Sequence, residues 1–181
     1  MPRRIGRVLP LLKGEIPMTD KVYNVLFICT GNSARSILAE GLLSHLGRGR
    51  FVAHSAGSHP SGTVNPFALS TLQALRIPSD GMRSKNWDEF ATPASAPLDF
   101  VFTVCDNAAG EMCPVWPGQP TTAHWGVPDP AAFMGPDDEK ARVFMATAVT
   151  LKRRIELMLA LPIHELDAMS IQRELKQIGT T

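Results

Sequence analysis

The segment from Tyr23 to Ser36 constrains the fold more than any other part of this chain. The run Val25–Cys29 is unbroken apolar sequence, as in a strand that is covered on both faces of a parallel sheet. A turn follows, in which Gly31 and Asn32 are suited to left-handed backbone dihedrals, and an apolar pattern of helical period comes after it. The segment therefore predicts a buried strand, a tight loop and a helix.

A loop between a strand and a helix N-terminus is suited to binding an anion, because its amides and the positive helix end point at the same place. Arg35 can donate two hydrogen bonds to a tetrahedral oxyanion. The same field lowers the pKa of a cysteine from about 8.5 to about 3.5–7.5, so we predict a nucleophilic thiolate at Cys29, to which Ser36 can donate its hydroxyl. The predicted oxyanion-binding residues are Thr30, Gly31, Asn32, Ser33, Ala34, Arg35 and Ser36.

The alternative for this loop is a buried structural cysteine beside a helix-capping turn. Two other phosphate-binding loops are excluded by sequence, since the segment has neither the Gly-Lys-Ser/Thr of a nucleotide P-loop nor the Gly-x-Gly-x-x-Gly of a dinucleotide site.

Length and composition indicate one ordinary globular domain. The chain has 181 residues, of which 44% are hydrophobic and 19% charged, and its net charge is +1; nothing here favours a nucleic-acid partner. No apolar run approaches the ~20 residues that span a membrane. Three cysteines suit a reducing compartment better than a secreted disulfide scaffold. We expect a cytoplasmic protein with residues 1–20 as a poorly ordered N-terminal extension and residues 21–181 as a single domain.

Four apolar strands alternate with helices along the rest of the chain. This order predicts an α/β fold, namely a doubly wound four-stranded parallel sheet with helices on both faces. Such sheets bind ligands at the carboxyl ends of their strands, so Cys29, Cys105 and Asp129 should lie at one edge. The predicted strands are Tyr23–Cys29, Phe51–Ala56, Leu98–Val104 and Thr121–Trp125, and the main helices begin near Ala34, Pro66 and Asp137, with a short helix at Trp87–Phe90 and an amphipathic segment from Ala168 to Ile178.

Two further cysteines, Cys105 and Cys113, bound what reads as an irregular loop after the third strand. Their separation is unlike the ligand spacing of zinc sites. Two inert buried cysteines are one interpretation. The other is a redox pair, since an irregular loop can bring two Cα atoms within the ~7 Å that a disulfide requires.

The motif around Cys29 resembles the active-site loop of the low-molecular-weight protein tyrosine phosphatases and of the arsenate reductases built on that fold. The resemblance extends from about Tyr23 to the helix ending near Leu161. The cysteine pair that follows the third strand is similar to the pair of the thiol-dependent arsenate reductases, and phosphatases of the family have no need of it. The motif reads Cys29-Thr30-Gly31-Asn32-Ser33-Ala34-Arg35-Ser36.

This resemblance implies arsenate reduction by a three-cysteine relay, for arsenic detoxification. Cys29 would attack arsenate, with Asp129 as the general acid. Cys105 would then attack the Cys29 sulfur and release arsenite, and Cys113 would close a Cys105–Cys113 disulfide. Thioredoxin or a glutaredoxin/glutathione system would reduce that disulfide, and no tightly bound cofactor is implied.

Two further points follow from the resemblance. Many relatives have a second cysteine at the position of Ala34, so a protective disulfide within the loop is impossible here. Some arsenate reductases of this fold bind a potassium ion near the loop, at positions that Asn32, Glu40 and Ser55 match.

Two competing functions stay open at this point. One is a phosphatase that hydrolyses phosphomonoesters through a cysteinyl-phosphate on Cys29, with the other two cysteines idle. Phosphatases of the family usually frame their cleft with paired tyrosines, and this chain has one tyrosine, Tyr23, in the first strand. The other is a non-enzymatic oxyanion or redox sensor. We interpret His124, Trp116 and Trp125 as structural residues.

Overall fold

Strand β1 (Tyr23–Cys29) lies at the centre of the sheet. The computed structural model describes residues 21–181, so the prediction for residues 1–20 lies outside the described residues. Strand β1 pairs with β2 (Phe51–Gly57) on one side and β3 (Phe100–Thr103) on the other, and β3 pairs with β4 (Thr121–His124). All pairs are parallel, in the order β2-β1-β3-β4. Residues 25–28 are fully buried, as the apolar run predicted.

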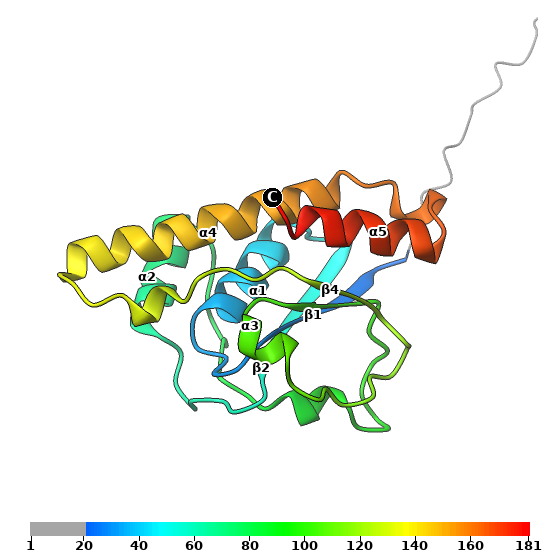
Figure 1. The fold of residues 1–181 in the computed structure, drawn as a ribbon, viewed down its shortest axis with the longest axis horizontal. Helices are drawn as coiled ribbons and strands as arrows, with labels where there is room; N and C mark the ends of the chain where they lie inside the picture. The colour runs from blue at the N-terminus through cyan, green and yellow to red at the C-terminus, as the bar shows by residue number, and fades with distance from the viewer. Residues whose placement is uncertain (1–20) are drawn as a thin grey trace, which may run out of the picture.

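The long helices pack on one another and on the sheet (Figure 1). Helix α1 (Arg35–Leu46) packs against β1 and β2, and α4 (Asp137–Leu159) crosses α1 and α2 (Pro66–Ala74). Asn65 caps α2 through the amide of Phe67 at 2.9 Å. Among the described residues, no helix has both the length and the apolar composition needed to cross a membrane. The remaining helical segments are η1 (Trp87–Phe90), α3 (Asp106–Ala109), η2 (Pro130–Ala132), η3 (Ile163–Glu165) and α5 (Ala168–Ile178).

An aromatic cluster fixes the end of the chain to the sheet. The rings of Phe102 and Trp125 stack with centroids 4.0 Å apart, and Phe27 stacks on Phe102 at 5.5 Å. The Trp125 indole N–H donates to the carbonyl of Leu175 in α5 at 2.9 Å. Helix α5 therefore packs on this molecule's own core. Both Trp125 and Trp116 are buried, so their predicted structural role is confirmed.

The predicted fold class is confirmed, but the segment after β3 is not simply irregular. It begins with the four-residue helix α3, in which the Cys105 sulfur accepts the amide of Ala108 at 3.4 Å as an N-cap. A helix of four residues is too short to show a 3.6-residue apolar period, which is why the sequence pattern missed it. Strands β3 and β4 are also shorter than predicted, since Leu98, Val104 and Trp125 lie outside them.

Candidate active site

Three carbonyls of the loop after β1 face the segment that follows β2, and each accepts a backbone amide from it at 2.9 Å. Because peptide units are planar and trans, the next amide in each case points to the opposite side, away from that segment. The backbone thus has the orientation of an anion nest. The pairs are Thr30 with His59, Gly31 with Ser61 and Ser33 with Asn65.

Asn32 fixes the shape of this loop from within. It is fully buried and has a left-handed backbone, with φ of 45°. Its side-chain amide donates to Ser36 Oγ at 2.9 Å and Ser55 Oγ at 3.0 Å, and its oxygen accepts the backbone N–H of Lys85 at 2.9 Å. Ser36 was predicted to donate to the Cys29 sulfur. Among the hydrogen bonds of the described residues, its hydroxyl instead accepts from Asn32.

Gly57, at the end of β2, is a site residue that sequence reasoning missed. It pairs in register with Cys29. A Cβ atom at this position would lie 2.4 Å from the carbonyl oxygen of Thr30, which is backbone and cannot move aside. The loop can approach β2 only because residue 57 has no side chain. The sequence feature that could have identified it is a glycine directly after the second predicted strand, which neighbours β1.

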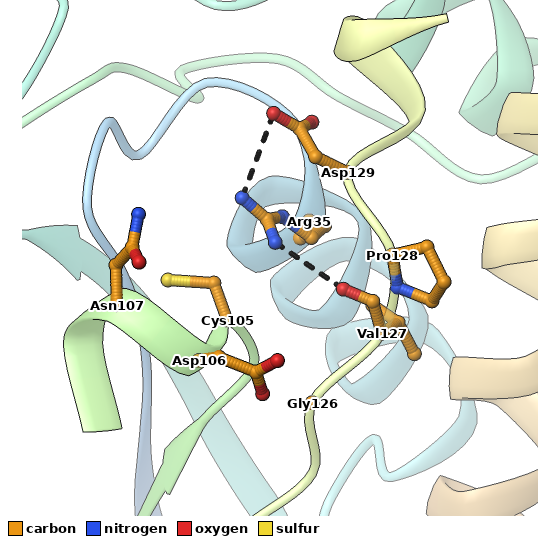
Figure 2. Close-up of a pocket in the computed structure, with 8 residues that line it drawn as sticks. All are labelled: Arg35, Cys105, Asp106, Asn107, Gly126, Val127, Pro128 and Asp129. Atoms are coloured by element: carbon orange, nitrogen blue, oxygen red, sulfur yellow. Dashed lines mark hydrogen bonds and ion pairs between the residues drawn. The ribbon is translucent and has the colours of Figure 1, made fainter. Parts of the chain in front are cut away.

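Arg35 is held at the mouth of the cavity from two sides (Figure 2). One terminal nitrogen donates to the carbonyl of Val127 at 3.2 Å, and the other lies 3.7 Å from a carboxylate oxygen of Asp129. Its Nε is buried and has no hydrogen-bond partner among the described residues, so an oxyanion would supply the acceptor it lacks. The cavity measures about 500 Å³ and is lined by Arg35, Cys105 and Asp129 among others.

Asp129 stands beside this cavity in a position suited to proton transfer. Its carboxylate caps η2 by accepting the amide of Ala131 at 3.0 Å. This contact fixes the backbone, and the side chain remains 43% exposed.

The thiols of Cys29 and Cys105 lie close enough for each to shift the pKa of the other. The pKa of Cys105 is lowered to about 5, first because Cys29 donates to its sulfur and also because Thr30 and the amide of Ala108 do so. The pKa of Cys29 is raised, first by that hydrogen bond and then by burial, although Arg35 opposes the shift. The two thiols therefore titrate as a coupled pair, in which each shifts the pKa of the other. A thiolate at Cys29 stays a prediction, and the sequence gave no sign that a second thiol lies beside it.

Cys113 lies apart from the other two cysteines. It is exposed, whereas Cys29 and Cys105 are buried. Its thiol donates to the carbonyl of Glu111 at 3.8 Å, and partial burial and Glu111 raise its pKa. It lines a second cavity of about 420 Å³ with Trp116 and His124. The structure thus brings together Cys29, Arg35, Cys105 and Asp129 and leaves Cys113 outside the site.

Asn32, Glu40 and Ser55 do meet behind the loop, but their arrangement does not fit a potassium ion. Ser55 donates to Glu40, and Asn32 presents its N–H₂ to Ser55 rather than its oxygen. The ammonium of Lys85 lies 3.8 Å from Glu40 and 3.4 Å from the Ser55 hydroxyl. Lys85 thus already supplies the positive charge that a potassium ion would bring. Sequence reasoning missed this lysine because it follows α2 in a segment without regular structure.

Comparison with known proteins agrees with this architecture. The family model described as low molecular weight phosphotyrosine protein phosphatase matches residues 24–174. A curated arsenate reductase of Halalkalibacterium halodurans is 34% identical over 77% of this chain and 95% of its own length. The arsenate reductase of Bacillus subtilis is 31% identical over the same shares.

Solved structures give the same result. One of an arsenate reductase in a phosphate-binding state is 27% identical, with a TM-score of 0.58 over 77% of this chain and 98% of that one. A thioredoxin-dependent arsenate reductase of Corynebacterium glutamicum is 28% identical, with a TM-score of 0.51 over 75% of this chain and 63% of that one. The chain therefore belongs to the low molecular weight phosphotyrosine protein phosphatase family, in the group of that family to which these arsenate reductases belong.

Proposed function

We propose that this protein reduces arsenate to arsenite. The observation that carries the proposal is that the thiols of Cys29 and Cys105 lie close enough to shift each other's pKa, beside Arg35 and the loop after β1. A phosphatase needs one thiol there. A reductase needs a second thiol in reach of the first, because reducing As(V) to As(III) takes the two electrons that a dithiol gives up in forming a disulfide.

The first step is addition of arsenate to Cys29. The loop amides and Arg35 would hold three oxygens and stabilise the charge on them. The loop amides and Arg35 favour the thiolate of Cys29, whose proton passes to its neighbour Cys105, and this thiolate attacks arsenic. Asp129 then protonates the oxygen that leaves arsenic as water.

The second step is reduction. Cys105 returns its proton to solvent and attacks the Cys29 sulfur, which forms a Cys29–Cys105 disulfide and breaks the sulfur–arsenic bond. The bond's electron pair stays on arsenic, which leaves as arsenite. Cys113 then attacks Cys105 and displaces Cys29 as a thiolate. In the overall reaction, H₂AsO₄⁻ and two thiols are converted to H₂AsO₃⁻, one disulfide and water.

A thiol reductant must then act on the Cys105–Cys113 disulfide, and Cys113 is the exposed member of that pair. We propose thioredoxin as this reductant, because a neighbour of this chain is described as thioredoxin-dependent, with a glutaredoxin/glutathione system as the alternative. A relay of this kind works only where thiols are kept reduced, so we place the protein in the cytoplasm.

The test is arsenate-dependent oxidation of NADPH in the presence of thioredoxin and its reductase, run beside hydrolysis of an aryl phosphate. We expect arsenate-dependent oxidation in the wild type and its loss in Cys113→Ser. Rapid aryl phosphate hydrolysis that survives loss of both Cys105 and Cys113, with no arsenate-dependent oxidation under either reductant, would establish a phosphatase instead. The one tyrosine, Tyr23, packs between Phe51 and Phe100 in the sheet and does not frame the cavity.

A further inference from the structure

The imidazole of His124 is held at both of its nitrogens. Its Nδ1 lies 2.7 Å from the hydroxyl of Thr103, which is opposite it in the β3–β4 register, and its Nε2 lies 2.8 Å from a carboxylate oxygen of Asp106. A carboxylate only accepts hydrogen bonds, so Nε2 carries a proton. A ring bonded at both ends has a fixed orientation. The end of β4 is thereby tied to the residues on either side of Cys105.

A glycine makes room for this contact. A Cβ atom on Gly126 would lie 2.5 Å from His124 Nε2 and 2.8 Å from Asp106 Oδ1. Figure 2 shows the Asp106 carboxylate directed toward the backbone at Gly126. Both colliding atoms are side-chain ends that can swing away. A methyl group at this position would therefore separate the pair without forcing the backbone to move.

The His124–Asp106 contact supports helix α3, which is too short to be stable by itself. Helix α3 has four residues, far fewer than an isolated helix needs to be stable. Its folded form is supported by burial of Ala108, by the cap that the Cys105 sulfur gives the amide of Ala108 and by the contact of Asp106, its first residue, with His124. While α3 stays folded, the Cys105 sulfur is buried against Cys29 and Thr30.

Cys105 and Cys113 line different cavities. Asp106 lines the cavity above Arg35, whereas His124 lines the second cavity with Cys113. The Asp106–His124 contact therefore lies between the two. Cys105 is buried, Cys113 is exposed and the two are not bonded, so the segment between them, which begins with α3, has to move before their sulfurs reach bonding distance.

We propose that His124 and Asp106 are positioning residues that hold Cys105 against Cys29 during the first disulfide exchange and must separate before the second. This inference rests on the proposed relay. In the first exchange the Cys29–Cys105 bond forms and arsenic receives the electron pair of the broken sulfur–arsenic bond. In the second, Cys113 bonds to Cys105 and Cys29 leaves as a thiolate. The contact is made in the dithiol protein, and its separation in the second exchange means that it favours the dithiol over the Cys105–Cys113 disulfide.

The decisive experiment is a redox titration of the full chain against dithiothreitol, in a Cys29→Ser background that leaves only Cys105 and Cys113. The Asp106 side chain is 93% exposed, and exposed pairs contribute modestly. We therefore expect His124→Ala, Asp106→Ala and Gly126→Ala each to favour the disulfide about fourfold, a shift of about 18 mV to more negative potential. Asp106→Asn keeps an acceptor for His124 and should recover most of the shift.

His164→Ala is the matched control, since that histidine also pairs with a carboxylate, Glu165, at 3.4 Å but lies far from α3 in the chain. The proposal would be overturned if the three variants had the same reduction potential as this control. It would also be overturned if Gly126→Ala did not shift the potential as His124→Ala and Asp106→Ala do. Circular dichroism of each variant, recorded first, confirms that the comparison is between folded proteins.

A second readout is the rate of arsenite release in a single turnover by chains with all three cysteines. We expect the three variants to release arsenite about fourfold more slowly while their affinity for phosphate is not weakened. Unchanged release, or a parallel loss of phosphate affinity, would contradict a positioning role. If the wild type releases no arsenite, the proposed function fails, and the redox titration still decides on His124 and Asp106 by itself.

Discussion

At Cys105, three hydrogen-bond donors converge on one sulfur. Cys29, Thr30 and the amide of Ala108 all stabilise its thiolate, and together they outweigh the cost of burial. Arg35 favours the thiolate of Cys29. The two nucleophiles of the relay therefore titrate as one coupled pair, in which the ionisation of one thiol depends on the other.

Removing Cys29 should raise the pKa of Cys105, because the hydrogen bond from Cys29 is the largest cause of its lowering to about 5. We expect the thiolate absorbance of Cys113→Ser to titrate with a first midpoint near 5, and that of Cys29→Ala/Cys113→Ser to titrate at clearly higher pH. The single variant is the control. A double variant that still titrates near 5 would show that Thr30 and α3 suffice.

At the scale of elements, the loop depends on how closely β2 approaches it. Gly57→Ala places a methyl group 2.4 Å from the carbonyl of Thr30. We expect the loop to be displaced, with a loss of about 1–3 kcal/mol in unfolding free energy and a larger proportional loss of phosphate binding, measured by denaturant titration and calorimetry. Gly110→Ala, where φ is −88° and an added Cβ would lie 3.6 Å from its nearest neighbour, controls for loss of a glycine. Normal phosphate affinity in Gly57→Ala would contradict this account of the nest.

Helix α1 contributes Glu40 to an internal ion pair that supports the loop from behind. Burial raises the pKa of Glu40, and Lys85 opposes that shift. Lys85→Met leaves the carboxylate without its partner, at a cost of about 3 kcal/mol near neutral pH. Lys152→Met, which breaks the exposed pair with Glu156, should cost at most about 0.5 kcal/mol.

The pH dependence of Lys85→Met has a definite sign. Without the ammonium, the pKa of Glu40 rises further above its ordinary value of 4.5. The folded variant then binds the proton more tightly than the unfolded chain does. Its unfolding free energy should therefore fall as pH rises from about 4.5 through the raised pKa. Urea titrations across this range check it, and a flat difference from wild type would show that Glu40 does not depend on Lys85.

For the molecule as a whole, the sequence predicted the strands, turns and helix caps that regular local patterns indicate. The apolar run of β1, the turn after it and the cap at Asn65 are local signals, and the strand order places Cys29, Cys105 and Asp129 at one edge. Contacts between distant segments carry no such signal. Gly57, Lys85 and the pairing of His124 with Asp106 depend on where loops meet in space. Cys105 was predicted at the right edge, but its effect on the pKa of Cys29 could be seen only once the two sulfurs were in contact.

The most direct test of the relay is a single turnover of the reduced protein with arsenate and no added reductant, followed by peptide mapping of the disulfide. We predict one arsenite per chain, a Cys105–Cys113 disulfide and a free thiol at Cys29. Cys105→Ser should hold arsenate on Cys29 and release no arsenite. Undiminished arsenite release from Cys105→Ser, or no arsenite from the wild type, would contradict the account.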